Sequence, residues 1–228
     1  MESRGCIVLI RHGQTEWSLS GQHTGRTDMQ LTPAGAADAA ALRPVLRRCD
    51  FGLVLISPLR RARDTARMAG LSGQTDADLL EWDYGAWEGR TSANIRGDLK
   101  DPSWTIWNRP IPSGATPGEQ CEDVATRARR VLGRCTPVLE SGEDCVLVAH
   151  GHLLRILTAT WLGMPAIGGR LFTLDAGSLS RLGFENQQEV ILSLNARPDR
   201  PSRSSPPPPP LHGGAGGTPR PGAPHPHM

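Results

Sequence analysis

The amino-acid sequence predicts an α/β protein that folds as a three-layer α/β/α sandwich around a mostly parallel mixed sheet. Short apolar runs rich in β-branched residues, typical of strands buried on both faces, occur at residues 6–10, 53–56 and 146–149. Segments with helical periodicity separate these runs, and further strand-like segments cluster within residues 171–194. Because strand and helix alternate early and strands accumulate late, the order favours helices on both faces of one sheet.

Two helices are predicted by matching start signals. Residues 32–33 place a threonine before a proline, as an N-cap and a first helical residue do, and apolar residues at helical spacing continue to residue 48. Residues 57–58 repeat this arrangement with serine and proline. The helix that they begin is expected to run to Ala69 and to stop at Gly70, since glycine adopts the left-handed conformation that ends many helices.

The second half of the chain predicts two more helices and three strands. Residues 119–139 carry apolar residues at helical spacing, although Pro137 is expected to kink this helix or end it early. Residues 152–162 form the next helix, which Gly163 closes. Alternating apolar residues then predict three strands, at residues 171–174, 179–184 and 190–194.

One domain accounts for the folded part of the chain. The sequence has 228 residues, which suits a single well-buried α/β domain, and we place the catalytic domain at residues 1–196. Residues 197–228 are rich in Pro, Gly, Ser and Arg and include successive prolines at residues 206–210. We expect a disordered extension there, rather than a polyproline segment that binds a partner, and we exclude its histidines from the chemistry.

Composition excludes several classes of partner. Residues 1–196 hold 21 basic and 22 acidic side chains, so the formal net charge of +2 comes from the arginines that follow them. Lys100 is the only lysine, and the basic face of a nucleic-acid-binding protein is missing. The five cysteines form no C-x-x-C pair, and no apolar segment approaches the roughly 20 residues that span a bilayer. We therefore expect a cytoplasmic protein with no disulfide framework and with neither nucleic acid nor membrane as a partner.

The ends of two predicted strands carry residues that suit phosphate chemistry. The first apolar run ends at Arg11, His12 and Gly13, and the third ends at His150 and Gly151. Ligands of α/β sheets collect outside the carboxyl ends of strands, where a cation beside a nucleophile suits a phosphoryl group. A lone histidine after a strand is usually structural, but two of them, each followed by glycine, favour one shared site.

A helix start and an aromatic segment add an arginine and two carboxylates. Arg61 lies in the first turns of the helix that follows Pro58, where the positive helix end and a guanidinium together favour an anion. Glu81 and Glu88 lie among tryptophans and a tyrosine, surroundings in which a carboxyl can serve as a general acid. Residue types and spacing do not separate these two acids, and a surface carboxylate is the alternative for each.

Further short motifs accompany these residues. The full set lies at residues 11–13, 24–25, 31–35, 57–62, 65–66, 81, 85, 88–89, 117–119 and 150–151. Through these motifs the chain resembles the histidine phosphatase superfamily, also called the phosphoglycerate mutase-like family, across residues 5–195. The resemblance implies that the sandwich is phosphoglycerate mutase-like.

The resemblance also implies roles for the residues of the predicted site. His12 is implied to be the nucleophile, and Glu81, not Glu88, to be the proton donor to the leaving oxygen. Three residues are implied to hold the phosphoryl oxygens, namely Arg11, Arg61 and His150. A neutral imidazole attacks phosphorus in line while these groups stabilise the equatorial oxygens, so neither a metal nor another cofactor is expected.

Within the family, the chain resembles fungal sedoheptulose-1,7-bisphosphatases and mycobacterial acid phosphatases through residues 21–28, 81–85, 150–152 with Arg155, and 174–177. The implied substrate-binding residues are Ser18, Gln22, Thr24, Gly25, Ser57, Tyr84, Gly151, His152 and Arg155. Arg155 follows His152 by about one helical turn, so both are expected to face the cleft and to meet a second phosphate or a sugar hydroxyl. An arginine paired with a surface carboxylate is the alternative.

The expected activity is hydrolysis of phosphomonoesters on small phosphorylated metabolites, with sugar phosphates and bisphosphates such as sedoheptulose 1,7-bisphosphate as leading candidates. Cofactor-dependent mutases of the family carry a longer insertion than the short stretch between Glu81 and His150. Ser18 also stands where the mutases have asparagine. Phosphoglycerate mutase activity and a catalytically silent module that binds a phosphorylated ligand are the alternatives.

The catalytic positions, the histidine pair and the tryptophans bear on the choice between an enzyme, a silent module and a metal site. All five catalytic positions are filled, which favours an enzyme over a silent module. A metal site at His150 and His152 lacks the carboxylates or cysteines that would complete it. Trp104 and Trp107 are expected to lie in a loop over the pocket. The oligomeric state stays open, with a homodimer among the alternatives.

Overall fold

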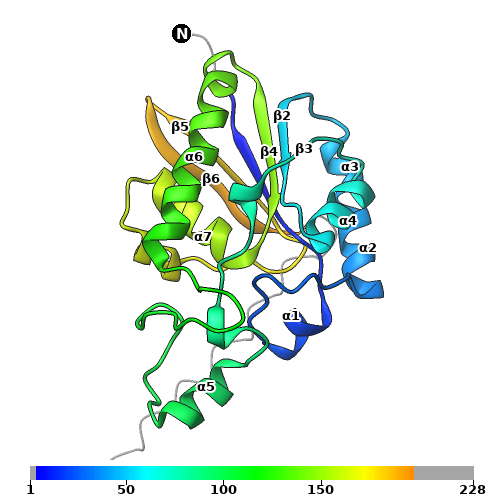
Figure 1. The fold of residues 1–228 in the computed structure, drawn as a ribbon. Coiled ribbons are helices and arrows are strands. Elements are labelled where there is room, and N and C mark those ends of the chain that lie inside the picture. Colours follow the sequence, from blue (N-terminus) through cyan, green and yellow to red (C-terminus); the bar gives the residue numbers. More distant parts are fainter. Residues whose placement is uncertain (1–3, 198–228) are drawn as a thin grey trace, which may run out of the picture.

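The computed structural model describes residues 4–197, which fold around one six-stranded sheet (Figure 1). The strands are β1 (Ile7–Arg11), β2 (Phe51–Ile56), β3 (Gln74–Thr75), β4 (Asp144–Ala149), β5 (Leu179–Glu185) and β6 (Gln188–Ala196). They lie side by side in the order β3-β2-β4-β1-β5-β6. Neighbours among β1 to β4 are parallel, whereas β5 is antiparallel to both β1 and β6. The prediction of a mostly parallel mixed sheet is confirmed.

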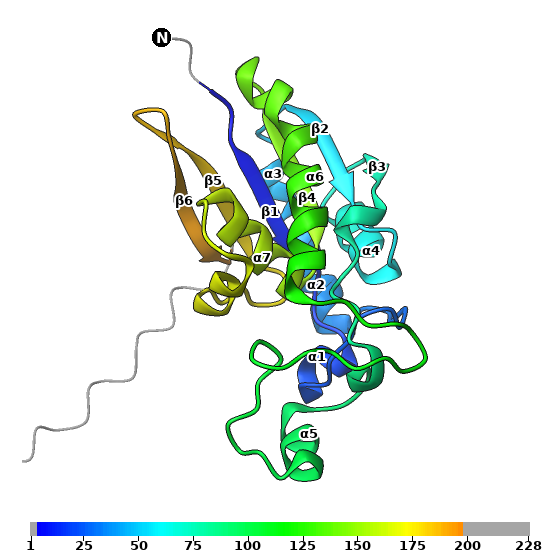
Figure 2. The same cartoon turned by 60° about the vertical axis from the view of Figure 1, so that its left-hand side comes forward.

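Helices cover both faces of the sheet and extend beyond one end of it. The α-helices are α1 (Glu16–Ser20), α2 (Pro33–Ala41), α3 (Arg43–Leu46), α4 (Arg60–Met68), α5 (Ser92–Leu99), α6 (Cys121–Glu140) and α7 (Gly151–Trp161). Short 3₁₀-helices are η1 (Ala77–Leu79), η2 (Gly85–Trp87) and η3 (Ala166–Leu171). Figures 1 and 2 place α6 and α7 on one face of the sheet and α2, α3 and α4 on the other. The predicted three-layer sandwich is therefore confirmed.

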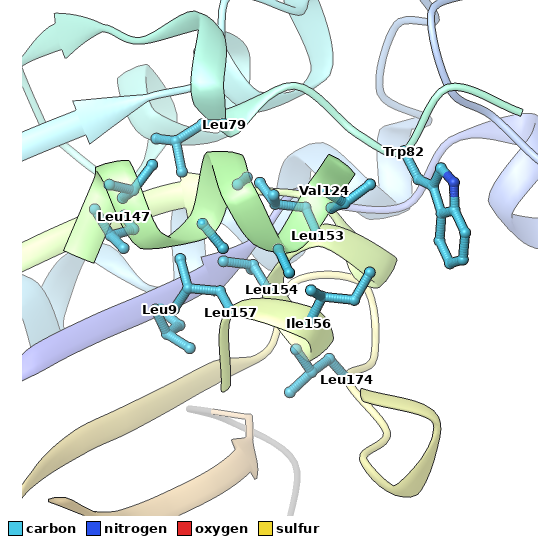
Figure 3. Packing of buried hydrophobic residues seen from close by; sticks show 14 of the residues in the cluster. Leu9, Leu79, Trp82, Val124, Leu147, Leu153, Leu154, Ile156, Leu157 and Leu174 are labelled. Carbon is cyan, nitrogen blue, oxygen red and sulfur yellow. The ribbon is translucent and has the colours of Figure 1, made fainter. Parts of the chain in front are cut away.

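The central strands send alternate side chains into two separate cores. From β1, Ile7 and Leu9 lie in the core under α6 and α7, whereas Val8 and Ile10 lie in the core under α3 and α4. Figure 3 shows the first core, in which Leu9 is packed together with side chains from β4, α6 and α7. Burying such an aliphatic side chain contributes about 1.5–3 kcal/mol, so the same strand stabilises both helical layers.

Prolines account for two differences from the predicted helices. The helix predicted to reach residue 48 breaks at Leu42, because Pro44 at the start of α3 has no N–H to donate into the preceding turn. Pro137 does not end its helix, and α6 continues past it. The neighbouring Cys135 and Leu139 are buried in the core, which offsets the one hydrogen bond that Pro137 removes.

Two further predictions of local structure are wrong. Ser57 does not cap the helix after it, because α4 begins later with Leu59 as its N-cap and the Ser57 hydroxyl is bonded to His150. The strand predicted at residues 171–174 is absent from the described chain, since Leu171 ends η3 and a loop follows. The sequence patterns did not predict α1, α5 and β3, which are short.

The carboxyl ends of β1, β2 and β4 lie at the end of the sheet that faces α1 and α5 (Figure 1). Arg11 pairs with Ala149 at the ends of β1 and β4, so the next residues, His12 and His150, lie side by side. Within residues 4–197, no helix is both long and apolar enough to span a membrane. The predicted C-terminal extension lies outside the described residues beyond position 197.

Candidate active site

A cavity of about 200 Å³ lies at this end of the sheet. It is lined by Arg11, His12, Ser18, Gly21, Gln22, His23, Thr24, Glu81, Gly151, His152, Arg155 and Leu174. Most of the predicted site residues are therefore brought together around one space. The other predicted residues do not line it, and these are Gly25, Ser57, Arg61, Tyr84 and His150.

His12 directly follows β1, and its imidazole is held in one orientation. Its Nδ1 lies 2.7 Å from the carbonyl oxygen of Gly13, so we assign the proton to Nδ1 and the lone pair to Nε2. The side chain is buried, and burial together with the charges of Arg61 and Arg11 holds the pKa of His12 well below its usual value. His12 is therefore a neutral imidazole at pH 7, the form that acts as a nucleophile.

The glycines after the two strand-end histidines permit close packing. A Cβ on Gly13 would lie 2.3 Å from the carbonyl oxygen of Gly35, a distance that a real side chain cannot occupy. A Cβ on Gly151 would lie 3.2 Å from Cζ of Arg11, closer than an ordinary contact. Gly13 thus lets the chain turn against the start of α2, and Gly151 leaves room for the Arg11 guanidinium.

Arg11 places a positive charge in the wall of the cavity. Its Nη1 donates to the carbonyl oxygen of Leu174, while its buried Nε has no hydrogen-bond partner among the described residues. Burial lowers the pKa of Arg11, and the nearby Glu81 raises it in part, but an arginine starts high enough to stay charged at neutral pH. A buried guanidinium with an unsatisfied N–H favours an anion beside it. Leu174 lines the cavity although its residue type gave no signal.

Arg61 and His150 form a buried pair behind His12. Nε of Arg61 donates to Nδ1 of His150 at 3.1 Å, and Nε2 of His150 lies 2.7 Å from Oγ of Ser57. Because Nδ1 accepts, the proton of His150 is on Nε2. Burial and the charge of Arg61 hold the pKa of His150 well below its usual value, so this ring is also neutral. The ring centres of His12 and His150 are 5.1 Å apart.

Main-chain oxygens of the loop at residues 24–27 fix the Arg61 guanidinium. Nη1 donates to the carbonyl of Thr27 at 2.8 Å, and Nη2 donates to the carbonyls of Thr24 at 3.0 Å and Gly25 at 2.9 Å. The whole side chain is buried. Arg61 therefore adds positive charge immediately behind the cavity without lining it.

The two carboxylates that the sequence could not separate have different partners. Glu81 lines the cavity, and its oxygens accept from the N–H of Leu153 at 2.8 Å and of His152 at 3.1 Å in the first turn of α7. Glu88 does not line the cavity and instead accepts from two N–H groups of the loop at residues 24–27. Of the two acids, only Glu81 lies where it can exchange a proton with a group in the cavity.

Aromatic rings surround His152. The hydroxyl oxygen of Tyr84 lies 2.5 Å from Nδ1 of His152, and the rings of Trp107 and Trp82 are 5.1 Å and 5.9 Å from the imidazole ring. Burial holds the pKa of His152 well below its usual value and raises the pKa of Tyr84 well above its own. Both side chains are therefore uncharged at neutral pH.

His23 lines the cavity but was not predicted as a site residue. Burial lowers its pKa to about 4, and its ring centre lies 5.0 Å from that of Tyr84. Its Nε2 lies 3.4 Å from the hydroxyl oxygen of Ser92. The available signals were its position between Gln22 and Thr24, both of which were predicted, and its place in the segment at residues 21–28 that carries the resemblance.

Three polar side chains that line the cavity, those of Ser18, Gln22 and Thr24, donate hydrogen bonds to main-chain carbonyls. Oγ of Ser18 donates to the carbonyl of Thr15 at 2.9 Å, and Nε2 of Gln22 donates to the carbonyl of Gly89 at 2.7 Å. Oγ1 of Thr24 donates to the carbonyl of Gln22 at 3.1 Å. These contacts hold the wall of the cavity in shape.

Arg155 lines the cavity from the turn of α7 after His152. Its Nε and Nη2 donate to the carbonyls of Gly169 and Arg170, each at 3.0 Å, and its guanidinium lies 4.8 Å from the centre of the Trp107 ring. Its partners are thus carbonyl oxygens and a ring, not a surface carboxylate. Trp107 contacts both Arg155 and His152, so the loop after α5 lies beside the cavity, although neither Trp104 nor Trp107 lines it.

The cavity has neither a cysteine in its lining nor a group of side chains suited to a metal ion, within the residues that the structure describes. The cysteines are free thiols, and none of them lines the cavity. In the part of the chain that the structure describes, no three His, Cys, Asp or Glu side chains group closely enough to hold a metal ion.

Known proteins are similar to this chain in sequence. A family model for the histidine phosphatase superfamily (branch 1) matches residues 7–197. The acid phosphatase of Mycobacterium tuberculosis is 34% identical over 197 residues, which cover 84% of this chain and 94% of that protein. The sedoheptulose 1,7-bisphosphatase of Saccharomyces cerevisiae is 33% identical over 186 residues, which cover 69% of this chain and 67% of that protein.

Solved structures of related proteins are similar to this chain in fold. The structure of an open reading frame of Mycobacterium tuberculosis matches with a TM-score of 0.77 and 32% identity, covering 85% of this chain and 98% of that chain. A mycobacterial glucosyl-3-phosphoglycerate phosphatase in complex with VO3 matches with a TM-score of 0.72 and 30% identity, covering 85% of this chain and 99% of that chain.

Proposed function

The chain belongs to the histidine phosphatase superfamily and is a phosphoric monoester hydrolase. From this premise we propose that it hydrolyses small phosphorylated metabolites, with sugar phosphates and bisphosphates as leading substrates, through a phosphohistidine formed on His12. One observation carries the proposal. His12 is a buried, neutral imidazole whose Nδ1 is bonded to Gly13 and whose Nε2 keeps its lone pair, in a cavity that Arg11 and Glu81 also line.

In the first half of the proposed reaction, Nε2 of His12 attacks phosphorus opposite the leaving oxygen. The N–P bond forms as the P–O bond to the leaving group breaks, and Glu81 gives a proton to the departing oxygen. Arg11 in the cavity wall supplies positive charge and N–H donors to the equatorial oxygens, and Arg61 behind the nucleophile adds positive charge, while the neutral His150 accepts from Arg61 and so fixes the position of that guanidinium.

In the second half, water takes the place of the alcohol. Glu81, now a carboxylate, accepts a proton from a water molecule as that water attacks phosphorus. The N–P bond breaks, and free His12 and inorganic phosphate result. The sum of both halves is the hydrolysis of one ester bond by one water molecule.

The substrate part of the proposal is supported by the residues beyond the reacting phosphate. Arg155 and His152 line the same cavity from successive turns of α7, so a second phosphate or a sugar hydroxyl would meet a cation and an imidazole there. Relatives named sedoheptulose 1,7-bisphosphatase and glucosyl-3-phosphoglycerate phosphatase also carry sugar phosphates in their names. We therefore propose sedoheptulose 1,7-bisphosphate as the first compound to test.

The test measures inorganic phosphate released from a panel of sugar monophosphates, sugar bisphosphates and 3-phosphoglycerate. His12→Ala is expected to lower kcat by at least about 10⁴-fold, because the covalent intermediate can no longer form. His212→Ala removes a histidine outside the catalytic domain and is the matched control, which is expected to keep the wild-type rate. Hydrolysis by His12→Ala at the wild-type rate would contradict the mechanism.

The same panel tests the substrate class. Phosphate release that favours no sugar phosphate over other phosphomonoesters would contradict the substrate proposal and leave the mechanism in place. Transfer of the phosphoryl group between the carbons of phosphoglycerate, with little release of phosphate, would indicate a mutase instead.

A further inference from the structure

The contact between Tyr84 and His152 lies in the proposed site, but the phosphoryl transfer does not use it. The hydroxyl oxygen of Tyr84 is 2.5 Å from Nδ1 of His152. Tyr84 is 2% exposed and does not line the cavity, whereas His152 does. Any effect of the Tyr84 hydroxyl on a bound molecule is therefore transmitted through His152.

Hydrogen-bond satisfaction fixes the direction of this contact. A phenol has one O–H to donate, and a neutral imidazole has one N–H and one acceptor nitrogen. If Nδ1 of His152 carried the proton, the hydroxyl hydrogen of Tyr84 would be buried without an acceptor among residues 4–197. Buried donors are rarely left in that state. When Tyr84 donates instead, Nδ1 is the acceptor and the proton of His152 is on Nε2.

The groups that face His152 keep this ring uncharged. Burial and the nearby positive groups Arg155, on the same helix, and Arg11, at the end of β1, hold its pKa well below the usual value. His23, from the segment before α2, faces the same ring with its centre 6.2 Å away. Burial keeps the Tyr84 hydroxyl protonated, so it remains a donor.

We propose that Tyr84 is a positioning residue: it holds His152 as the Nε2–H tautomer, and this N–H donates to an uncharged oxygen, a hydroxyl or a carbonyl, on the leaving group. The inference rests on the proposed function, because it names chemistry that the same cavity recognises. The two residues that α7 contributes then have separate tasks, since Arg155 supplies a charge for an anion and His152 supplies a neutral donor. Tyr84 itself does not touch the substrate.

The tautomer is measured directly from the ¹⁵N chemical shifts of the histidine rings in the full-length labelled protein at pH 7. His152 is expected to show a protonated Nε2 and an unprotonated Nδ1, with the signals assigned from their loss in His152→Gln. Tyr84→Phe keeps the ring and removes only the hydroxyl, so it is expected to move His152 toward the Nδ1–H form. Ser92→Ala removes the hydroxyl beside His23 instead and is expected to leave His152 unchanged.

Two outcomes overturn the proposal. One is a protonated Nδ1 in the wild-type protein, and the other is an unchanged tautomer in a folded Tyr84→Phe variant. A thermal melt shows whether that variant folds, and if it does not, the wild-type tautomer decides alone.

The specificity role is measured with two probes that share a three-carbon chain, glycerol 3-phosphate and propyl phosphate. Tyr84→Phe is expected to raise KM for glycerol 3-phosphate about ten-fold, the usual contribution of one hydrogen bond, and to change KM for propyl phosphate less than about two-fold. The kcat values are expected to stay nearly unchanged, because Tyr84 does not contact the reacting atoms. If a probe is not turned over, its inhibition constant against p-nitrophenyl phosphate replaces KM.

The double variant Tyr84→Phe/His152→Gln tests whether Tyr84 acts through His152. It is expected to bind glycerol 3-phosphate no more weakly than His152→Gln alone, since the hydroxyl has lost its partner. Additive effects, or equal effects of Tyr84→Phe on both probes, would overturn the positioning role. Failure of the wild-type protein to hydrolyse any phosphomonoester would count against the proposed function alone, because the tautomer measurement needs no turnover.

Discussion

Nδ1 of His150 accepts a hydrogen bond from Nε of Arg61 over 3.1 Å, and this contact joins the end of β4 to the first turn of α4. Both side chains are fully buried, so solvent does not screen the charge of Arg61 from the cavity in front of it. The proton of His150 consequently lies on the nitrogen that faces Ser57. The contact thus places the charge of Arg61 behind the cavity and also determines the tautomer of His150.

Arg61→Lys tests this buried layer. Lysine keeps a positive charge, but one ammonium group cannot donate to His150 and to the carbonyls of the loop at residues 24–27 at once. We expect kcat/KM to fall at least about 100-fold and the free energy of unfolding to fall by about 1–3 kcal/mol. Steady-state kinetics and urea denaturation measure these effects. Arg63→Lys, on the exposed face of the same helix, is the control, and a wild-type rate in Arg61→Lys would contradict a role in the reaction.

Glu81→Gln is expected to remove proton donation to the leaving oxygen. The loss in kcat is expected to be about 10²–10⁴-fold for an alkyl phosphate but much smaller for p-nitrophenyl phosphate, whose leaving group departs without a proton. Glu88→Gln is the matched control. It is expected to lower the free energy of unfolding by weakening the loop at residues 24–27, with the same rate factor for both substrates. Equal losses on both substrates in Glu81→Gln would rule out general acid catalysis by this residue.

Arg155→Ala tests the second phosphate. Because Arg155 lines the cavity, we expect its loss to raise KM for a sugar bisphosphate about ten-fold more than KM for the matching monophosphate. Arg170→Ala is the control, since its exposed side chain is removed while its carbonyl, which Arg155 contacts, stays in place. An equal rise for both substrates would show that no second phosphate binds at Arg155.

His23→Gln tests how stability depends on pH. The pKa of His23 is about 4 in the folded protein, against about 6.5 in an unfolded chain. Between these values the unfolded chain binds a proton that the folded chain does not, so the free energy of unfolding falls as the pH falls from about 6.5 toward 4. Well above pH 7 neither state binds this proton, and His23 adds no pH dependence.

At pH 5 this one group is expected to account for a loss of about 2 kcal/mol relative to pH 7.5. Urea denaturation at both pH values measures the loss, which is expected to be smaller by about that amount in His23→Gln than in the wild type. Comparing the two losses removes any pH-independent effect of the substitution. Identical losses in both proteins would mean that His23 is not buried in its neutral form.

Position at a strand end or a helix start made much of the site predictable from the sequence. Arg11, His12 and His150 each mark the carboxyl end of an apolar run, and parallel neighbouring strands bring such ends together. Arg61 was predicted from its place in the first turns of a helix, and the structure brings it behind those strand ends. These positions follow from apolar runs and a helix start in the sequence, together with the rule that ligands of α/β sheets bind at the carboxyl ends of the strands.

The contacts that give Glu81 and Glu88 different partners, and the contact between Tyr84 and His152, were not predictable from the sequence. They depend on packing between segments that lie far apart in the chain. Nothing in the spacing of Tyr84 and His152 relates them, and their contact exists only because the segment at residues 81–84 lies against the first turn of α7. Residues 171–174 show why an alternating pattern misled. Leu174 gives its carbonyl to Arg11 instead of to a neighbouring strand, so its burial reflects the cavity and not a sheet.

The loop at residues 24–27 binds Arg61 and Glu88 through main-chain atoms, with carbonyls toward the base and N–H groups toward the acid. A substitution exchanges a side chain and leaves these groups in place, so replacing Thr24 need not disturb either contact. Gly25 is restricted, because a Cβ there would lie 2.5 Å from a main-chain oxygen. Natural or directed evolution can therefore alter the chemical character of the cavity face while the charged layer behind it is inherited unchanged.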